Sequence, residues 1–225
     1  MRAIFESLFD IAYLVTIITL GFILARKGQT SVLKNYGIMA LVLGFGDAFH
    51  LVPRMFALLT GGFSQPSVIA ALGVGKLITS ITMTVFYVLL FFIWRQIFEK
   101  KATALTWVVL SLALARIVLC LFPQNAWLSA DAPLSWGIYR NIPFLLIGLV
   151  IIIAFYSQRK NAAYPPYRHM GLAIILSFGF YIPVVLWADT LPVLGMLMIP
   201  KTIAYVWMVW MGFKVYKGNL SNSTS

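Results

Sequence analysis

Residues 43–54 read LGFGDAFHLVPR and lie inside an apolar segment, 36–59, that is long enough to cross a bilayer as a helix. Asp47, His50 and Arg54 are spaced i, i+3 and i+7, so a helix places them on one face. Charged side chains within a membrane span normally face the protein interior or a wet cavity. We therefore expect this face to form the wall of a functional site.

The composition is typical of a polytopic membrane protein. Of 225 residues, 61% are hydrophobic and only 10% are charged, whereas a soluble domain carries roughly 25% charged residues. The net charge of +11 would suggest nucleic acid in a soluble protein, but here basic loops explain it, and we expect no nucleic-acid partner. The single cysteine, Cys120, excludes an intramolecular disulfide and offers no zinc cluster. We predict no metal site and no cofactor.

The sequence predicts an all-α, single-domain bundle, 1–217, followed by a short polar cytoplasmic tail, 218–225. Each apolar segment has about the length of a spanning helix. The seven predicted segments are 5–25, 36–59, 70–94, 104–122, 136–156, 170–188 and 193–215.

The distribution of basic residues predicts the orientation of these helices. Of the 17 Lys and Arg residues, 11 lie in alternate loops and at the C-terminal end. The outer loops, 60–67 and 123–135, contain none. Because basic loops stay in the cytoplasm, we expect the N-terminus outside and the C-terminus inside. Short loops without a sorting signal favour a bacterial plasma membrane.

Five cations remain within the spans, each on a different helix, once Arg2 and the 11 topological cations are set aside. With the predicted orientation, all of them fall in the outer half of the membrane, where Lys and Arg should be scarce. We expect them to converge on one outward-opening cavity. The expected anion contacts are Arg54, Arg116 and Lys201, and the residues expected at the mouth are Lys76 and Arg140.

Two structural explanations for these cations stay open. Lys76 and Arg140 are close enough to the surface to reach lipid headgroups. Arg54 could pair with Asp47, or with Asp189 at the outer end of the sixth helix, and a network of internal ion pairs could neutralise most of the set. Tyr181 lies beside a proline in the sixth segment and is expected to line the same partly aromatic cavity.

The Asp47–His50 pair admits two interpretations. A carboxylate one turn before an imidazole can transfer protons or activate water, which would make these two residues the catalytic pair of a membrane-embedded hydrolase or transferase. The same pair can instead handle protons for a binding protein or transporter. The sequence leaves enzyme, transporter and receptor open, as it does the oligomeric state.

Two family resemblances bear on this choice. Lys201 in the seventh helix and residues 180–187, FYIPVVLW, resemble microbial rhodopsins over about two helices. That resemblance implies a retinal bound to Lys201; the third helix carries Lys76 where the family has a carboxylate counter-ion, so Asp47 would have to substitute. Gly46-Asp47 is similar to the Gly-Asp of lysoplasmalogenase-like membrane hydrolases. Only His50 and His169 are present, on opposite sides, which excludes the zinc chemistry of ceramidase and adiponectin-receptor hydrolases.

The function best supported by the sequence is binding of an anionic small molecule or lipid headgroup, for sensing or transport, with membrane lipids as the surrounding partners. The alternatives are a lipid hydrolase or transferase using Asp47 and His50, a retinal protein using Lys201, and a structural membrane subunit.

Overall fold

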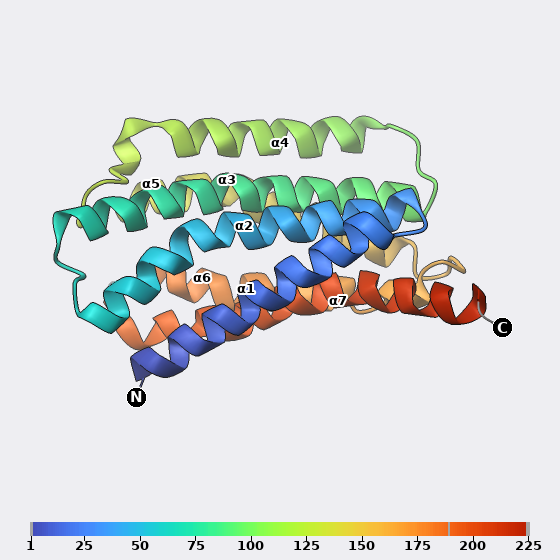
Figure 1. Ribbon diagram of the computed structural model, residues 1–225. Helices are drawn as coiled ribbons and strands as arrows, with labels where there is room; N and C mark the ends of the chain where they lie inside the picture. Colours follow the sequence, from blue (N-terminus) through green and yellow to red (C-terminus); the bar gives the residue numbers. More distant parts are fainter. Residues whose placement is uncertain (1, 189, 224–225) are drawn as a thin grey trace.

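The chain folds into an all-α bundle in a computed structural model that describes residues 2–188 and 190–223 (Figure 1). Seven helices in this part of the chain are long and apolar enough to span a membrane, which confirms the predicted fold class. They are α1 (Arg2–Lys27), α2 (Ser31–Thr60), α3 (Pro66–Ile97), α4 (Ala104–Leu121), α5 (Leu134–Ser157), α6 (Met170–Trp187) and α7 (Met198–Ser223). Short 3-10 helices occupy Pro123–Asn125, Pro165–Tyr167 and Pro192–Leu197.

The seventh helix differs most from its predicted bounds. The apolar run was expected to be helical over 193–215, but α7 begins at Met198 after the 3-10 turn Pro192–Leu197. Pro200 lies in the first turn of α7. Backbone N–H groups in this turn have no partner within the helix, so the N–H that proline lacks costs no helical hydrogen bond. At the other end α7 continues to Ser223, so most of the predicted polar tail is helical.

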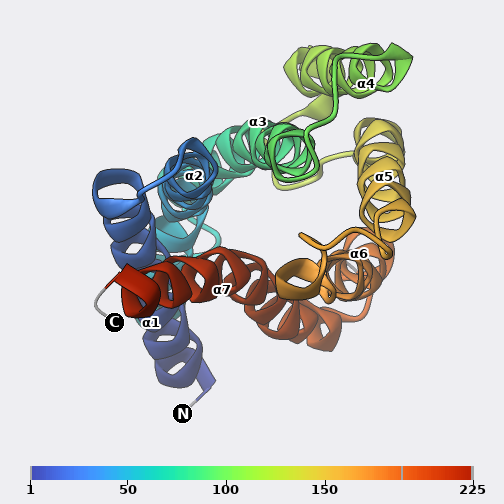
Figure 2. The same cartoon turned by 90° about the vertical axis from the view of Figure 1, so that its right-hand side faces the viewer.

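The helices form a ring in chain order (Figure 2). Each helix packs against the next, and α1 contacts α7 to close the ring. Helix α3 also contacts α5 directly, which leaves α4 outside the ring in both views. The N-terminus and the α2–α3 connection lie at one end of the bundle, and the C-terminus lies at the other (Figure 1).

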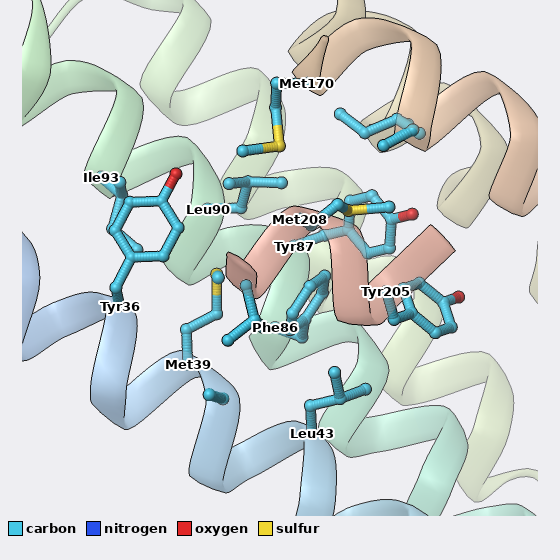
Figure 3. Close-up of a cluster of buried hydrophobic side chains, with 14 of the residues drawn as sticks. Tyr36, Met39, Leu43, Phe86, Tyr87, Leu90, Ile93, Met170, Tyr205 and Met208 are labelled. Atoms are coloured by element: carbon cyan, nitrogen blue, oxygen red, sulfur yellow. The ribbon is translucent and has the colours of Figure 1, made fainter. Parts of the chain in front are cut away.

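The centre of the ring is filled by aromatic, leucine and methionine side chains (Figure 3). Tyr36 and Met39 of α2, Tyr87 and Leu90 of α3 and Met208 of α7 are all fully buried. Because this core lies beside the N-terminal half of α2, it occupies the part of the ring away from the Asp47–Arg54 face.

The most extensive helix contact is between α2 and α3, and two glycines let these helices approach closely. A Cβ atom on Gly75 would collide with the backbone of Phe49 and His50, and one on Gly46 would collide with the side chain of Thr82. The Thr79 hydroxyl donates to the Gly46 carbonyl at 3.0 Å across this contact. Small residues with an interhelical hydrogen bond are a common way to pack membrane helices.

We predict that Gly75→Ala lowers the thermal stability of the protein. The added methyl meets backbone atoms, so the helices must separate, and overpacking of this kind costs about 1–3 kcal/mol. That corresponds to roughly 2–4 °C in Tm per kcal/mol for a chain of this size. Unfolding can be followed by labelling of Cys120, which is buried in the folded protein. Gly179→Ala is the matched control because a Cβ there meets nothing within 4 Å; equal Tm changes in both variants would contradict the prediction.

Candidate functional site

A small charged cavity lies among α1, α2, α3, the 3-10 turn Pro192–Leu197 and α7, with a volume of about 70 Å³. It is lined by Asp47, His50 and Arg54 of the predicted α2 face, and Pro53 interrupts the hydrogen-bonding pattern of the same helix. The remaining polar and charged lining residues come from the neighbouring helices. They are Glu6, Asp10, Thr79, Lys201 and Thr202.

The two cations of the cavity already have acidic neighbours. Arg54 Nη2 donates to Glu6 Oε2 at 3.2 Å, so Arg54 pairs with α1 and not with Asp47. Its other predicted partner, Asp189, lies outside the described residues. Lys201 is 7% exposed, and Asp47 is its acidic electrostatic neighbour. These contacts make the cavity a site of mixed charge, because the lining holds three carboxyl groups, one lysine and one arginine.

Aromatic side chains complete the surroundings of Asp47 and Lys201. Tyr13 donates its hydroxyl proton to Asp47 Oδ2 at 2.6 Å. The Lys201 ammonium lies 4.5 Å from the ring centroid of Tyr181 and 5.2 Å from that of Tyr205. Such cation–π contacts contribute about 0.5–2 kcal/mol each. Lys201 is therefore held between a carboxylate and two aromatic faces.

Asp47 and His50 share the cavity wall. The Asp47 carboxylate accepts a hydrogen bond from Tyr13, on another helix. His50 Nδ1 is buried and has no hydrogen-bond partner within the part of the chain that the structure describes. Both groups therefore lie where they can exchange protons with the cavity.

The other three predicted cations lie elsewhere. Arg140 Nη1 donates to Asn125 Oδ1 at 2.8 Å, and its guanidinium carbon lies 4.4 Å from the ring centroid of Trp127. Arg116 is buried at the α4–α5 contact, 3.3 Å above the ring of Phe144. Lys76 is exposed on α3 and does not line the cavity. Of the five, only Arg54 and Lys201 line the cavity, but Lys76 acts electrostatically on His50 and Arg116 acts on Lys201.

Tyr181 lies between these two groups of cations. Its ring faces Lys201, and its hydroxyl donates to Asn141 Oδ1 at 3.2 Å on α5. It also interacts electrostatically with Arg116 and Arg140. Tyr181 thus connects the cavity to the arginines of α4 and α5 and is not itself a lining residue of the cavity.

Sequence reasoning considered Glu6 and Asp10 of α1 only as possible acidic partners of the cations, and it did not single out Tyr13. In the structure Glu6 and Asp10 line the cavity, and Tyr13 bonds Asp47. Their spacing of four and three residues within an apolar segment is the signal that could have found them, because it places all three on one helix face. Thr79 belongs to the hydroxyl side chains that follow Lys76 along the same helix. It lines the cavity, and its hydroxyl donates a hydrogen bond to the Gly46 carbonyl.

Fold and site together define a multi-pass helical membrane protein with a small cavity of paired charges at one end of its bundle. Comparison with models of known protein families, with curated proteins and with solved structures gave no match.

We predict that Tyr13→Phe destabilises the protein. The change removes the hydrogen bond to Asp47 in a buried setting, where Tyr13 is 4% exposed, and should cost about 1–3 kcal/mol. Thermal unfolding in mild detergent measures the effect. Tyr139→Phe is the matched control, since Tyr139 is 51% exposed. A Tyr13→Phe protein as stable as the control would show that this hydrogen bond does not hold α1 to α2.

Proposed function

We propose that this protein binds a small anion in the α1–α2–α7 cavity and takes up a proton as it does so, for sensing or for transport across a bacterial plasma membrane. The observation that supports the proposal is the arrangement of Lys201 and Arg54, each next to a carboxylate on the wall of one cavity. A volume of about 70 Å³ suits a small ion with a few waters and is far below the roughly 300–1,000 Å³ of a drug-sized site.

Proton uptake follows from the charge balance of the cavity. An anion that contacts Lys201 replaces Asp47 as the counter-charge of the ammonium group. An ionised carboxylate left without a cation at low dielectric is costly, so Asp47 binds a proton when the anion enters. A protonated carboxyl still offers an acceptor oxygen to the Tyr13 hydroxyl. The anion and the proton therefore bind together as one neutral pair.

The enzymatic alternative and the retinal alternative each have less support from the geometry. A hydrolase would need Asp47 to orient His50, but the carboxylate bonds Tyr13 instead. A retinal on Lys201 would find Asp47 as counter-ion, as the rhodopsin resemblance implies. However, the rings of Tyr181 and Tyr205 flank the ammonium group, and the cavity beside it is small. Both features favour a compact ion over a long polyene.

The proposal predicts that anion affinity increases as the pH falls. If one proton binds with each anion, the affinity changes about tenfold per pH unit while Asp47 is otherwise ionised. Thermal stabilisation of the purified protein by chloride, nitrate, formate and phosphate, titrated at several pH values, measures this dependence. Lys201→Gln should abolish the stabilisation, and Arg54→Gln should weaken it.

Asp47→Asn separates charge pairing from other pH effects. The neutral amide leaves Lys201 without its carboxylate, so the variant should bind the anion more tightly and with little dependence on pH. Arg95→Gln is the matched control, since Arg95 does not line the cavity. The proposal would be overturned if anion affinity depended on pH as steeply in Asp47→Asn as in the unaltered protein, or if anion binding strengthened as the pH rises.

An outward-facing cavity also requires the proposed orientation, with the N-terminus outside and the C-terminus in the cytoplasm. Because Cys120 is buried, cysteines introduced at exposed loop positions report the side of the membrane. A membrane-impermeant maleimide should label Ser64→Cys, in the α2–α3 connection, in intact cells. Asn161→Cys, in the α5–α6 connection, should be labelled only after permeabilisation. The reverse pattern would place the cavity on the cytoplasmic side.

A further inference from the structure

Arg116 is a buried cation with no acidic residue among its electrostatic neighbours in the part of the chain that the structure describes. Its side chain is 1% exposed, and Nε and Nη1 have no hydrogen-bond partner within the described part of the chain. Its electrostatic neighbours are Tyr181, Cys120 and Tyr205, none of which is a carboxylate. A guanidinium stays protonated in proteins, so the charge cannot be removed by losing a proton.

Local contacts offset only part of the energy needed to bury this charge. The ring of Phe144 lies 3.3 Å from the guanidinium carbon, a contact that contributes about 2 kcal/mol when desolvated. The side chain of Cys120, one turn further along α4 (Ala104–Leu121), is a hydrogen-bond neighbour of the guanidinium. The effective penalty for a buried ion is still several kcal/mol, and the unused N–H groups remain available to an anion.

An apolar groove lies directly beyond Phe144. It runs between α5 and α6 with a volume of about 160 Å³, and Phe144 forms part of its wall. Its polar lining residues are Asn141 and Tyr181, which hydrogen-bond to each other at 3.2 Å. The groove faces the lipid, as the exposure of Ile142 shows (51%). One aromatic ring therefore separates an apolar groove from an uncompensated cation.

We propose that this groove and Arg116 form a binding site for an acyl-chain amphiphile with an anionic head. The chain lies among the apolar residues of the α5–α6 groove. The head passes Phe144, whose ring swings aside, and accepts hydrogen bonds from Arg116 Nε and Nη1. Asn141 and Tyr181 lie on the path of the head. The source of this chemistry is a free fatty acid or an anionic phospholipid.

This site is separate from the proposed cavity for small anions. Neither Arg116 nor the lining residues of the groove belong to the wall of the α1–α2–α7 cavity, and none of Arg54, Asp47 or Lys201 lines the groove. The inference therefore stands or falls without the proton-coupled function. Asp47→Asn should leave amphiphile binding unchanged.

The test uses the full-length protein in nanodiscs of phosphatidylcholine. Photoactivatable palmitate is the probe, and photoactivatable palmityl alcohol, which has the same chain without charge, is its control. We expect palmitate to label α5 and α6 about tenfold more than the alcohol does, the factor that a charge-assisted hydrogen bond provides. Displacement of palmitate by oleate identifies a free fatty acid, and displacement by phosphatidylglycerol alone identifies a phospholipid head.

Matched variants assign the labelling to Arg116. Arg116→Gln should reduce palmitate labelling to the level of the alcohol, whereas Arg95→Gln should not, because Arg95 lies on α3 and does not line the groove. If Arg116→Gln fails to fold, Ile142→Trp blocks the groove with the charge intact and should reduce labelling by both probes. Equal labelling by palmitate and the alcohol, or retention of the difference in Arg116→Gln, would overturn the proposal.

Discussion

The bundle depends on pairing charges where bulk water is scarce. The charged residues of α2 could not lie within a membrane span unless neighbouring helices supplied their partners. Glu6 on α1 pairs with Arg54 at 3.2 Å, and Tyr13 on the same helix bonds Asp47 at 2.6 Å. These two contacts fix the rotation of α1 against α2. The cavity is a consequence of this pairing, because polar groups that satisfy one another need not be packed against apolar atoms.

The two groups of cations show how differently a membrane protein can treat a buried charge. Arg54 and Lys201 have acidic neighbours and line a cavity, so an anionic ligand can replace a carboxylate as their counter-charge. Arg116 contacts an aromatic ring and has no carboxylate neighbour among the described residues, and Arg140 bonds the amide of Asn125. A paired cation releases its carboxylate only if a proton or another ion compensates, whereas Arg116 can accept an anion directly. The two proposed sites therefore differ in pH dependence for a physical reason.

Much of the fold was predictable because span length and apolar composition are properties of single segments. The seven helices and the α2 face carrying Asp47, His50 and Arg54 follow from such local patterns. The sequence did not predict which cations line the cavity. Helical spacing determines how far along a helix a residue lies and on which face, but not which neighbouring helix it meets. The sequence predicts the position of Arg116 along its helix, yet only the position of α4 outside the ring shows that Arg116 does not line the cavity that holds Lys201. The start of α7 was missed because residues 193–197 are apolar enough for a span but form a 3-10 turn.

The packed core constrains what the cavity can do. On the side of the cavity toward the N-terminal half of α2, the ring is closed by fully buried side chains that include Met39, Leu90, Met170 and Met208 (Figure 3). An ion bound at Lys201 could not cross this layer without a rearrangement of the core. Methionine side chains have three rotatable bonds and repack more readily than branched residues. Sensing needs only the charge exchange in the cavity, whereas transport requires the methionine layer to open as well, so the behaviour of this layer distinguishes the two functions.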